Sequence, residues 1–123
     1  MTADAPTVFV VDDDLSVRRA VDRLLRSAGF LVESFGSGDE FLEQVGPERR
    51  GCVVLDVRMP GQSGFDLFDR LIADGRDLGV IFVTGHTDLP AAMRAMNAGA
   101  TFHFLVKPFE AEELISAVEQ ALR

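Results

Sequence analysis

Residues that could bind a cation and an anion stand directly after four short apolar runs of the chain. Asp12 and Asp13 follow the first run, and Asp56, Thr84 and Lys107 follow three later ones. Clustered carboxylates cannot all stay ionised without a counter-charge, so one keeps a proton, Lys107 neutralises part of the charge, or a metal binds. An all-oxygen set suits Mg²⁺, whereas the shortage of His and Cys disfavours zinc.

Asp56 is the expected acceptor of a phosphoryl group within this set. It stands alone at the end of its run, whereas Asp12 and Asp13 form a pair suited to holding a metal. Aspartate carboxylates form covalent acyl phosphates in proteins. The metal and Lys107 would stabilise charge on the phosphoryl oxygens, and Thr84 would hydrogen-bond one of them. Each residue alone is better explained by capping or loop hydrogen bonds, so the joint placement carries the prediction.

The apolar runs themselves are predicted to be the strands of a parallel sheet. Residues 8–11, 52–55 and 80–83 are continuously apolar, as in strands that are covered on both faces. Residues 31–35 and 102–106 complete a set of five strands. The carboxyl ends of parallel strands share one edge of the sheet, where ligands bind. The polar residues named above should therefore meet.

Stretches with apolar residues at helical spacing alternate with these strands. They are expected at residues 15–28, 41–45, 65–72, 90–98 and 114–122. Asp14 and Ser63 are expected to cap two of these helices, and Ser37 with Glu40 has the spacing of a capping box. Five strands alternating with five helices predict an α/β fold with right-handed crossovers and helices on both faces of the sheet.

Composition limits the class of protein further. The 123 residues, 47% of them hydrophobic, fit one domain with its own core. Twelve basic and 20 acidic side chains give a net charge of −8, which argues against direct binding of nucleic acid. No apolar stretch approaches the ~20 residues of a membrane span, and no secretion leader is visible. We therefore expect a soluble, cytoplasmic domain.

The ordered set of motifs resembles the receiver domain of two-component response regulators, and most closely its FixJ-type subgroup. The motifs are residues 10–13, 55–64, 83–86, 95–100 and 107–109. The resemblance covers essentially the whole chain, so residues 1–123 are expected to be one receiver domain. It implies a flavodoxin-like, or CheY-like, fold with the strand order 2-1-3-4-5.

The resemblance also implies what the acidic residues do. Asp56 would take a phosphoryl group from the phosphohistidine of a sensor histidine kinase. The domain would phosphorylate and dephosphorylate itself and would not be a turnover enzyme. Asp13, with Asp12, Asp56 and the backbone carbonyl of Arg58, would hold Mg²⁺, for which Mn²⁺ can substitute.

A conformational switch is a further implication of the resemblance. Thr84 would move toward the new phosphoryl group, and Lys107 would pair with it. Phe104, three positions before Lys107, stands where an aromatic side chain turns inward and remodels the surface of helix four, strand five and helix five. The expected output is transcription, through a C-terminal DNA-binding effector domain and a phosphorylation-dependent homodimer. Arg58 and His86 stand where side chains affect the lifetime of the acyl phosphate.

The segment before Lys107 departs from the family pattern. Six residues, 101–106, separate Ala100 from Lys107, where family members usually have five. One added residue in a strand reverses the facing of every later side chain unless a bulge or loop absorbs it. We expect residues 101–103 to absorb it and to leave Phe104 and Lys107 in register.

Three other functions remain as alternatives. A haloacid-dehalogenase-type phosphatase or phosphotransferase needs a second Asp two residues after its nucleophile, where this chain has Arg58, and it needs a cap insertion. A nucleotide- or flavin-binding domain needs a glycine-rich turn after its first strand, where this chain has Asp12, Asp13 and Asp14. A degenerate receiver that acts only as an interaction module is disfavoured because all the key residues are present.

Overall fold

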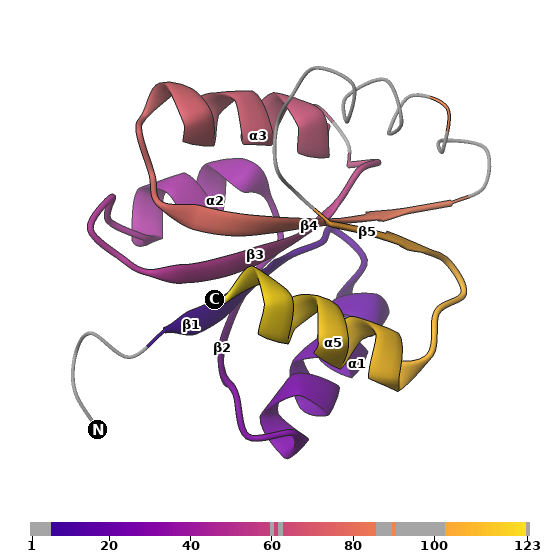
Figure 1. Cartoon of the computed structure of the whole chain (residues 1–123). Helices are drawn as coiled ribbons and strands as arrows, with labels where there is room; N and C mark the ends of the chain where they lie inside the picture. Colours follow the sequence, from indigo (N-terminus) through magenta and orange to yellow (C-terminus); the bar gives the residue numbers. More distant parts are fainter. Residues whose placement is uncertain (1–5, 60, 62, 86–89, 91–102, 123) are drawn as a thin grey trace.

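Five short parallel strands form a single sheet with helices on both faces (Figure 1). The structure, a computed structural model, describes residues 6–59, 61, 63–85, 90 and 103–122 of the chain. Its strands are β1 (Thr7–Val11), β2 (Leu31–Phe35), β3 (Gly51–Asp56), β4 (Leu78–Thr84) and β5 (His103–Val106). Their order in the sheet is β2-β1-β3-β4-β5, which confirms the predicted topology.

The central strands β1 and β3 are apolar because protein covers both of their faces. Every residue of β1 is buried, and so are the four residues before Asp56 in β3. The strands pair in register, with Val11 opposite Leu55 on one side and opposite Phe35 on the other. This register brings the residues that follow β1 beside the end of β3.

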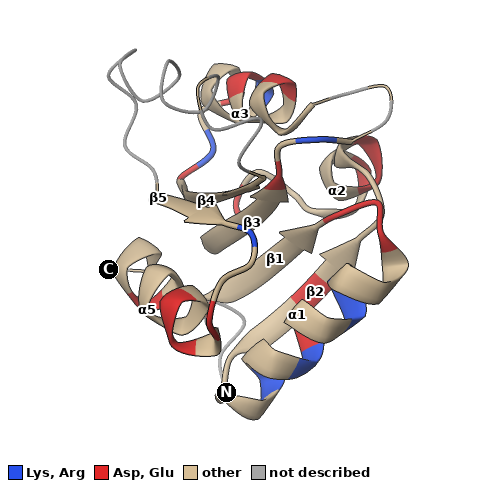
Figure 2. Ribbon diagram, turned by 90° about the vertical axis from the view of Figure 1, so that its right-hand side faces the viewer, with Lys and Arg blue, Asp and Glu red and all other residues tan. Residues whose placement is uncertain are grey.

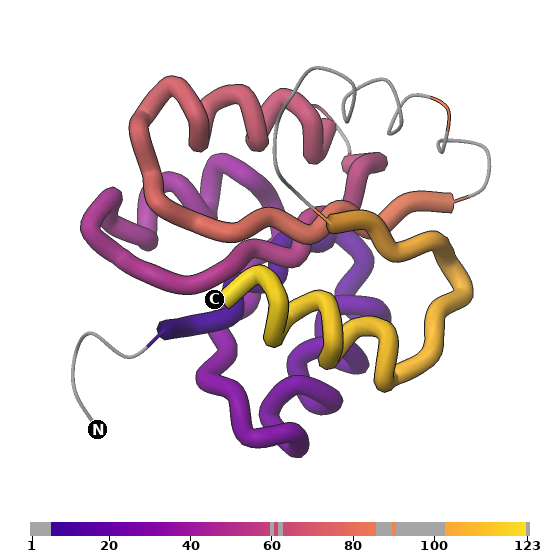
Figure 3. The backbone as a smooth tube through the Cα atoms, viewed as in Figure 1, coloured from indigo at the N-terminus to yellow at the C-terminus, as the bar shows by residue number. Residues whose placement is uncertain are grey.

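The helices form two layers, one on each face of the sheet (Figure 1). Helices α1 (Leu15–Ser27) and α5 (Ala111–Ala121) cover one face, and α2 (Gly38–Gln44) and α3 (Gly64–Ala73) cover the other. Figure 3 shows the chain crossing between the layers as it passes from α1 through β2 to α2. The helix predicted at residues 90–98 lies outside the described residues, apart from Pro90, which is helical. Among the helices described, none combines the length and apolar character needed to cross a membrane.

The two faces of the sheet are packed with different side chains. Under α2 and α3 the buried residues include five phenylalanines among aliphatic side chains, and the ring of Phe41 meets those of Phe9 and Phe35 edge-on at 5.5 Å. Under α1 and α5 they are aliphatic, with Cys52 among them. Burial raises the pKa of the Cys52 thiol to about 12, so this side chain is a small, uncharged part of the core.

Side chains cap the helices close to where the sequence predicts. The Asp14 carboxylate accepts from the N–H groups of Ser16 and Val17 at 2.9 and 3.2 Å at the start of α1. Ser63 caps α3 within a complete capping box. At α2 the predicted box is only half formed. The Ser37 hydroxyl accepts from Glu40, but the Glu40 carboxylate reaches past Ser37 to the preceding N–H group, 3.1 Å away.

Candidate functional site

Three carboxylates converge at the carboxyl ends of β1 and β3. Asp12 and Asp13 follow β1 directly, and Asp56 is the last residue of β3. One carboxylate oxygen from each lies within 4.8 Å of the corresponding oxygens of the other two. The in-register pairing of β1 with β3 produces this convergence, because both strands end at the same level of the sheet.

Asp12 is the buried member of the cluster. Its side chain is 5% exposed, and its Oδ1 accepts from the Asp14 N–H at 2.9 Å. Burial raises the pKa of Asp12 to about 6, and repulsion from Asp56 and Asp13 adds to this, against the opposing effects of the Asp14 N–H and the Lys107 ammonium. An anion in this position is unfavourable unless a cation joins it.

Asp56 lies at the floor of the cluster with polar partners on both oxygens. Its Oδ1 accepts from the Arg58 N–H at 3.1 Å, and its Oδ2 lies 3.8 Å from the Lys107 Nζ. Burial raises the pKa of Asp56, and the Arg58 hydrogen bond and the Lys107 charge offset part of that effect. The side chain of Asp56 is 11% exposed, so its surface is accessible only at the open edge of the sheet.

Thr84 and Lys107 are tied together through the backbone at the ends of β4 and β5. The Lys107 N–H donates to the Thr84 carbonyl at 2.8 Å. The Thr84 side chain is almost fully buried, and its hydroxyl donates to the Gly85 carbonyl at 3.1 Å. The Thr84 hydroxyl is therefore held by a bond to the neighbouring residue.

Phe104 lies on β5, opposite Phe82 of β4, with the two rings stacked at 5.6 Å. Alternate residues of a strand share a face, so Phe104, Phe82 and Thr84 face the same side of the sheet. Residues 103–106 pair with residues 81–84 in unbroken register, without a bulge. Of residues 101–103, where we expect the added residue to be absorbed, His103 belongs to this ladder, and residues 101 and 102 lie outside the described residues.

Of the two positions expected to affect the lifetime of the acyl phosphate, the structure describes Arg58 but not His86. Arg58 is exposed on the turn after β3, two residues beyond Asp56, with its N–H bonded to that carboxylate. His86 lies outside the described residues. Arg58 therefore lies beside the acidic cluster, on the exposed turn that follows Asp56.

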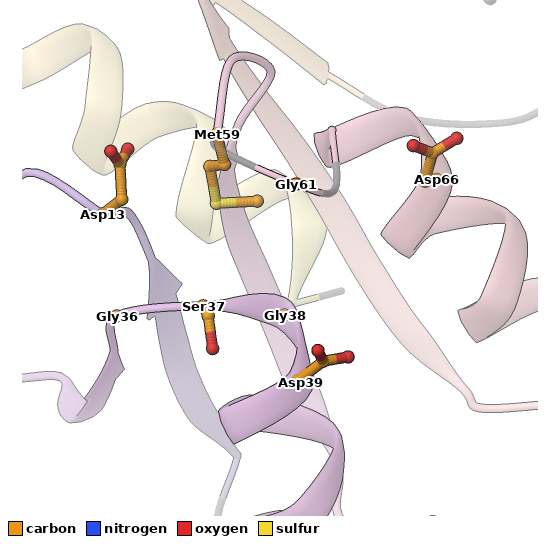
Figure 4. A pocket seen from close by; sticks show the side chains of 8 residues that line it. All are labelled: Asp13, Gly36, Ser37, Gly38, Asp39, Met59, Gly61 and Asp66. Atoms are coloured by element: carbon orange, nitrogen blue, oxygen red, sulfur yellow. The ribbon is translucent and has the colours of Figure 1, made fainter.

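A surface pocket of about 670 Å³ opens beside Asp13 (Figure 4). Met59 projects into it from the turn after β3, and the turn between β2 and α2 forms its other wall (Figure 4). Asp13 was predicted as part of the site, whereas residue type and spacing did not place Gly36, Ser37 and Gly38 beside it. The small size of these three residues is the signal that could have done so. The pocket gives the acidic cluster an open approach from the side of α2.

Gly64 fixes how closely α3 approaches the site. It is the first residue of α3 and is buried, and a Cβ added there would lie 2.5 Å from the backbone carbonyl oxygen of Asp56. The Gly64 N–H donates to the Val57 carbonyl at 3.0 Å. Helix α3 therefore begins against the backbone that carries Asp56.

The donor chemistry of the cluster fits Mg²⁺. All three side chains offer hard carboxylate oxygens, and among the described residues no His or Cys joins them. Mg²⁺ prefers such ligands at 2.0–2.1 Å and retains several waters. The open approach beside Asp13 leaves room for water and a phosphate. The arrangement can thus gather a divalent cation, a nucleophilic carboxylate and an ammonium group around one anion.

The fold and the site together define a class of protein, namely a doubly wound parallel sheet with a cluster of acidic residues at the carboxyl ends of its strands. The response regulator receiver domain family matches residues 8–119, and the chain belongs to this family. The predicted membership is confirmed.

Curated relatives match most or all of this chain. Response regulator protein TodT of Pseudomonas putida is 42% identical over 123 residues, which is 100% of this chain and 54% of TodT. Nodulation protein W of Bradyrhizobium diazoefficiens is 47% identical over 93% of this chain and 50% of its own. Transcriptional regulatory protein FixJ of Azorhizobium caulinodans is 46% identical over 94% of this chain and 54% of FixJ. The chain spans about half the length of these relatives.

Solved structures show the same fold. The response regulator StyR matches with a TM-score of 0.86 and 53% identity, over 96% of this chain and 59% of StyR. The crystal structure of FixJ-N matches with a TM-score of 0.86 and 39% identity, over 98% of this chain and 94% of FixJ-N. The predicted fold and the similarity to FixJ are both confirmed.

Proposed function

We propose that this domain accepts a phosphoryl group on Asp56 from the phosphohistidine of a sensor histidine kinase in a Mg²⁺-dependent reaction. One observation carries the proposal: the carboxylates of Asp12, Asp13 and Asp56 offer oxygens within 4.8 Å of one another, with Lys107 3.8 Å from Asp56. Membership of the receiver family supports it. The domain acts on itself and is not a turnover enzyme.

The transfer exchanges one bond to phosphorus for another. A carboxylate oxygen of Asp56 forms a bond to phosphorus as the bond between phosphorus and the donor imidazole breaks, and the imidazole takes up a proton. The Arg58 N–H orients the Asp56 carboxylate for attack. The Lys107 ammonium stabilises charge on the phosphoryl oxygens in the transition state.

Metal binding is assigned to the acidic cluster. Asp12, Asp13, Asp56 and the backbone carbonyl of Arg58 would hold Mg²⁺, or Mn²⁺ in its place. The ion supplies positive charge that offsets the phosphoryl oxygens. The Asp14 N–H holds the Asp12 carboxylate in place for this task.

The switch follows from the new charge on Asp56. A phosphoryl group brings about −1.5 to −2 charges and three acceptor oxygens. The Thr84 hydroxyl would leave the Gly85 carbonyl for one of these oxygens, and the space it vacates would admit Phe104. Two packings of similar free energy are required for one group to select between them. The surface that changes is formed by residues 90–98, β5 and α5, while Arg58 and His86 set the lifetime of the acyl phosphate.

The whole protein is proposed to be a cytoplasmic transcriptional response regulator. FixJ, which matches this chain over about half of its own length, is described as a transcriptional regulatory protein. Residues 1–123 would be its receiver domain, followed by a DNA-binding effector domain, with a homodimer formed on phosphorylation. Light scattering with and without beryllofluoride tests the dimer, and a monomer in both states would exclude it. The alternative is a degenerate receiver that acts only as an interaction module.

Intact-mass measurement after incubation with acetyl phosphate tests the proposal directly. We expect one phosphoryl adduct with Mg²⁺, none without it, and none in Asp56→Asn. Asp69→Asn is the matched control, because Asp69 is an exposed carboxylate on α3. It should be phosphorylated as the wild type is. Steady turnover of phosphate monoesters would instead indicate a phosphatase, and an absent adduct with unaltered partner binding would indicate the degenerate receiver.

A further inference from the structure

The side chain of Arg18 turns back from α1 to the end of β1. Its Nη1 donates to the backbone carbonyl of Asp12 at 2.7 Å, and the side chain is partly buried. Other arginines line α1 as well (Figure 2), but they do not reach this turn. Arg26 pairs with Asp22 of the same helix, and Arg19 is exposed and makes no side-chain hydrogen bond or ion pair within the described residues.

The bond from Arg18 fixes the direction in which Asp13 leaves the strand. The Asp12 carbonyl belongs to the peptide unit that joins Asp12 to Asp13, and this unit is planar. Holding the carbonyl therefore holds the N–H of Asp13 as well. On the other side of Asp12, its N–H donates to the Phe35 carbonyl at 3.2 Å. The backbone of Asp12 is anchored from α1 and from β2.

Asp13 depends on this anchoring more than its neighbours do. The carboxylates of Asp12 and Asp56 each accept a backbone N–H that orients them. Asp13 is exposed, and no such bond to its side chain is found in the part of the chain that the structure describes. Its place in the cluster is therefore set by the backbone that Arg18 holds.

The turn between β2 and α2 packs against the same guanidinium. A Cβ added to Gly36 would lie 3.2 Å from the Arg18 Nη1 and 3.5 Å from a carboxylate oxygen of Glu40. Glu40 in turn accepts from the Gly36 N–H at 3.1 Å. Gly36 also lines the pocket beside Asp13 (Figure 4). Residue 36 can therefore carry a side chain only if the Arg18 guanidinium shifts.

We propose that Arg18 is a positioning residue for the metal site. By holding the peptide unit between Asp12 and Asp13, it keeps the Asp13 carboxylate beside those of Asp12 and Asp56. The inference rests on the proposed function in one respect, namely that this cluster binds Mg²⁺. Arg18 itself touches neither the metal nor the phosphoryl group.

Calorimetric titration of the protein with Mg²⁺ tests this role. We expect Arg18→Met to weaken Mg²⁺ binding about tenfold, the effect of one hydrogen bond from a charged group. Arg19→Met removes the same charge from the next residue and should bind within about twofold of the wild type. Gly36→Ala, which displaces the guanidinium without removing it, should lie between the two. Phosphoryl uptake from acetyl phosphate should fall in Arg18→Met at low Mg²⁺ and recover at saturating Mg²⁺.

A purely structural role for Arg18 gives a different result. Arg18→Met would then lower the melting temperature and leave the Mg²⁺ affinity unchanged, and this outcome overturns the inference. Equal weakening in Arg19→Met also overturns it, because the effect would then be general charge. If Arg18→Met does not fold, Arg18→Lys retains the charge but not the planar donor fork. It should bind Mg²⁺ about threefold more weakly, and an unchanged affinity overturns the inference.

The two proposals fail in distinguishable ways. A wild-type protein that binds Mg²⁺ but never carries a phosphoryl group refutes the proposed function and leaves the role of Arg18 intact. A wild-type protein that does both, together with an Arg18→Met variant of equal Mg²⁺ affinity, refutes only the role of Arg18. A wild-type protein that binds no Mg²⁺ refutes both.

Discussion

The two ends of the sheet handle charge in opposite ways. In the amino-terminal half of β1 and β2, the Arg49 guanidinium donates to Glu33 at 2.5 Å and to the Thr7 hydroxyl at 3.3 Å, and it lies over the Phe9 ring. At the carboxyl end, three carboxylates share one ammonium, Lys107, which lies 3.8 Å from the nearest of them. The first arrangement pairs opposite charges within the protein, whereas the second gathers like charges, which a bound cation would offset.

Two aspartates show the same contrast. Asp22 of α1 is partly desolvated, which raises its pKa, but hydrogen bonds from Ser34 and Arg26 more than offset this, so the pKa ends below its ordinary value. Asp12 has one backbone N–H and the more distant Lys107 charge to set against burial and two neighbouring carboxylates, and its pKa rises to about 6. Folding thus satisfies the charge of Asp22 and leaves that of Asp12 unsatisfied, which is the state expected of a binding site.

Among the changes that compare the two ends of the sheet, removal of Lys107 should give the largest effect on function. Lys107→Met removes the group that stabilises charge on the transferring phosphoryl oxygens, and we expect phosphoryl uptake to slow about 10²- to 10³-fold. The rate is measured by intact mass during incubation with acetyl phosphate at saturating Mg²⁺. Arg49→Met, which removes a cation from the other end of the sheet, should leave the rate within about twofold. A similar loss in both variants would contradict the division between the two ends.

Neutralisation of Asp12 should stabilise the metal-free protein at neutral pH. Asp12→Asn keeps an oxygen for the Asp14 N–H and removes a buried anion. With a folded-state pKa of about 6 against 3.8 when unfolded, the gain in free energy of unfolding at pH 7 is at most about 3 kcal/mol. Urea denaturation of the variant and the wild type without Mg²⁺ measures it.

The gain in free energy of unfolding from Asp12→Asn should increase as the pH rises from about 4 to 7. Between pH 3.8 and about 6 the folded protein holds a proton on Asp12 that the unfolded chain has lost. The contribution of Asp12 to stability is therefore most favourable below pH 3.8, falls as pH rises to about 6, and stays low above that. The advantage of Asp12→Asn should shrink toward pH 4, and Mg²⁺ should stabilise the wild type more than the variant. An advantage independent of pH would show that the buried charge of Asp12 is not its cause.

Removal of Arg49 should give the smallest effect, and only on stability. The side chains of Arg49 and Glu33 are 31% and 43% exposed, so solvent screens their attraction and we expect Arg49→Met to lower the free energy of unfolding by about 1 kcal/mol. Urea denaturation measures the loss, which Mg²⁺ should not alter. Arg50→Met, on the exposed neighbour, should change stability by less than about 0.5 kcal/mol. Equal losses in the two variants would show that the contacts of Arg49 contribute nothing specific.

The fold and the convergence of acidic residues could be predicted because both follow from local pattern. The strand at residues 31–35 was predicted with its observed bounds, and the caps at Asp14 and Ser63 were identified from residue type and spacing. The convergence of Asp12 with Asp56 follows once the sheet is parallel, because the ends of adjacent strands share an edge. None of these inferences depends on which partner a long side chain, such as that of an arginine, reaches.

The reach of long side chains could not be predicted. Arg18 and Arg19 are adjacent and identical in type, yet only Arg18 turns back to bind the Asp12 carbonyl. Likewise Glu40 bonds to Gly36 and not to Ser37, although the spacing indicated a capping box. In each case the partner is chosen by how separate elements pack together. A pattern along one element contains no information about that packing.

The close approach at Gly64 makes this position a test for reading related chains. Because a single methyl group there would press on the backbone that carries Asp56, a homologue with a bulkier residue at this position must shift the start of α3 or the end of β3. An uncharged residue that offers no side chain to a ligand thus sets how near the helix comes to the acidic cluster.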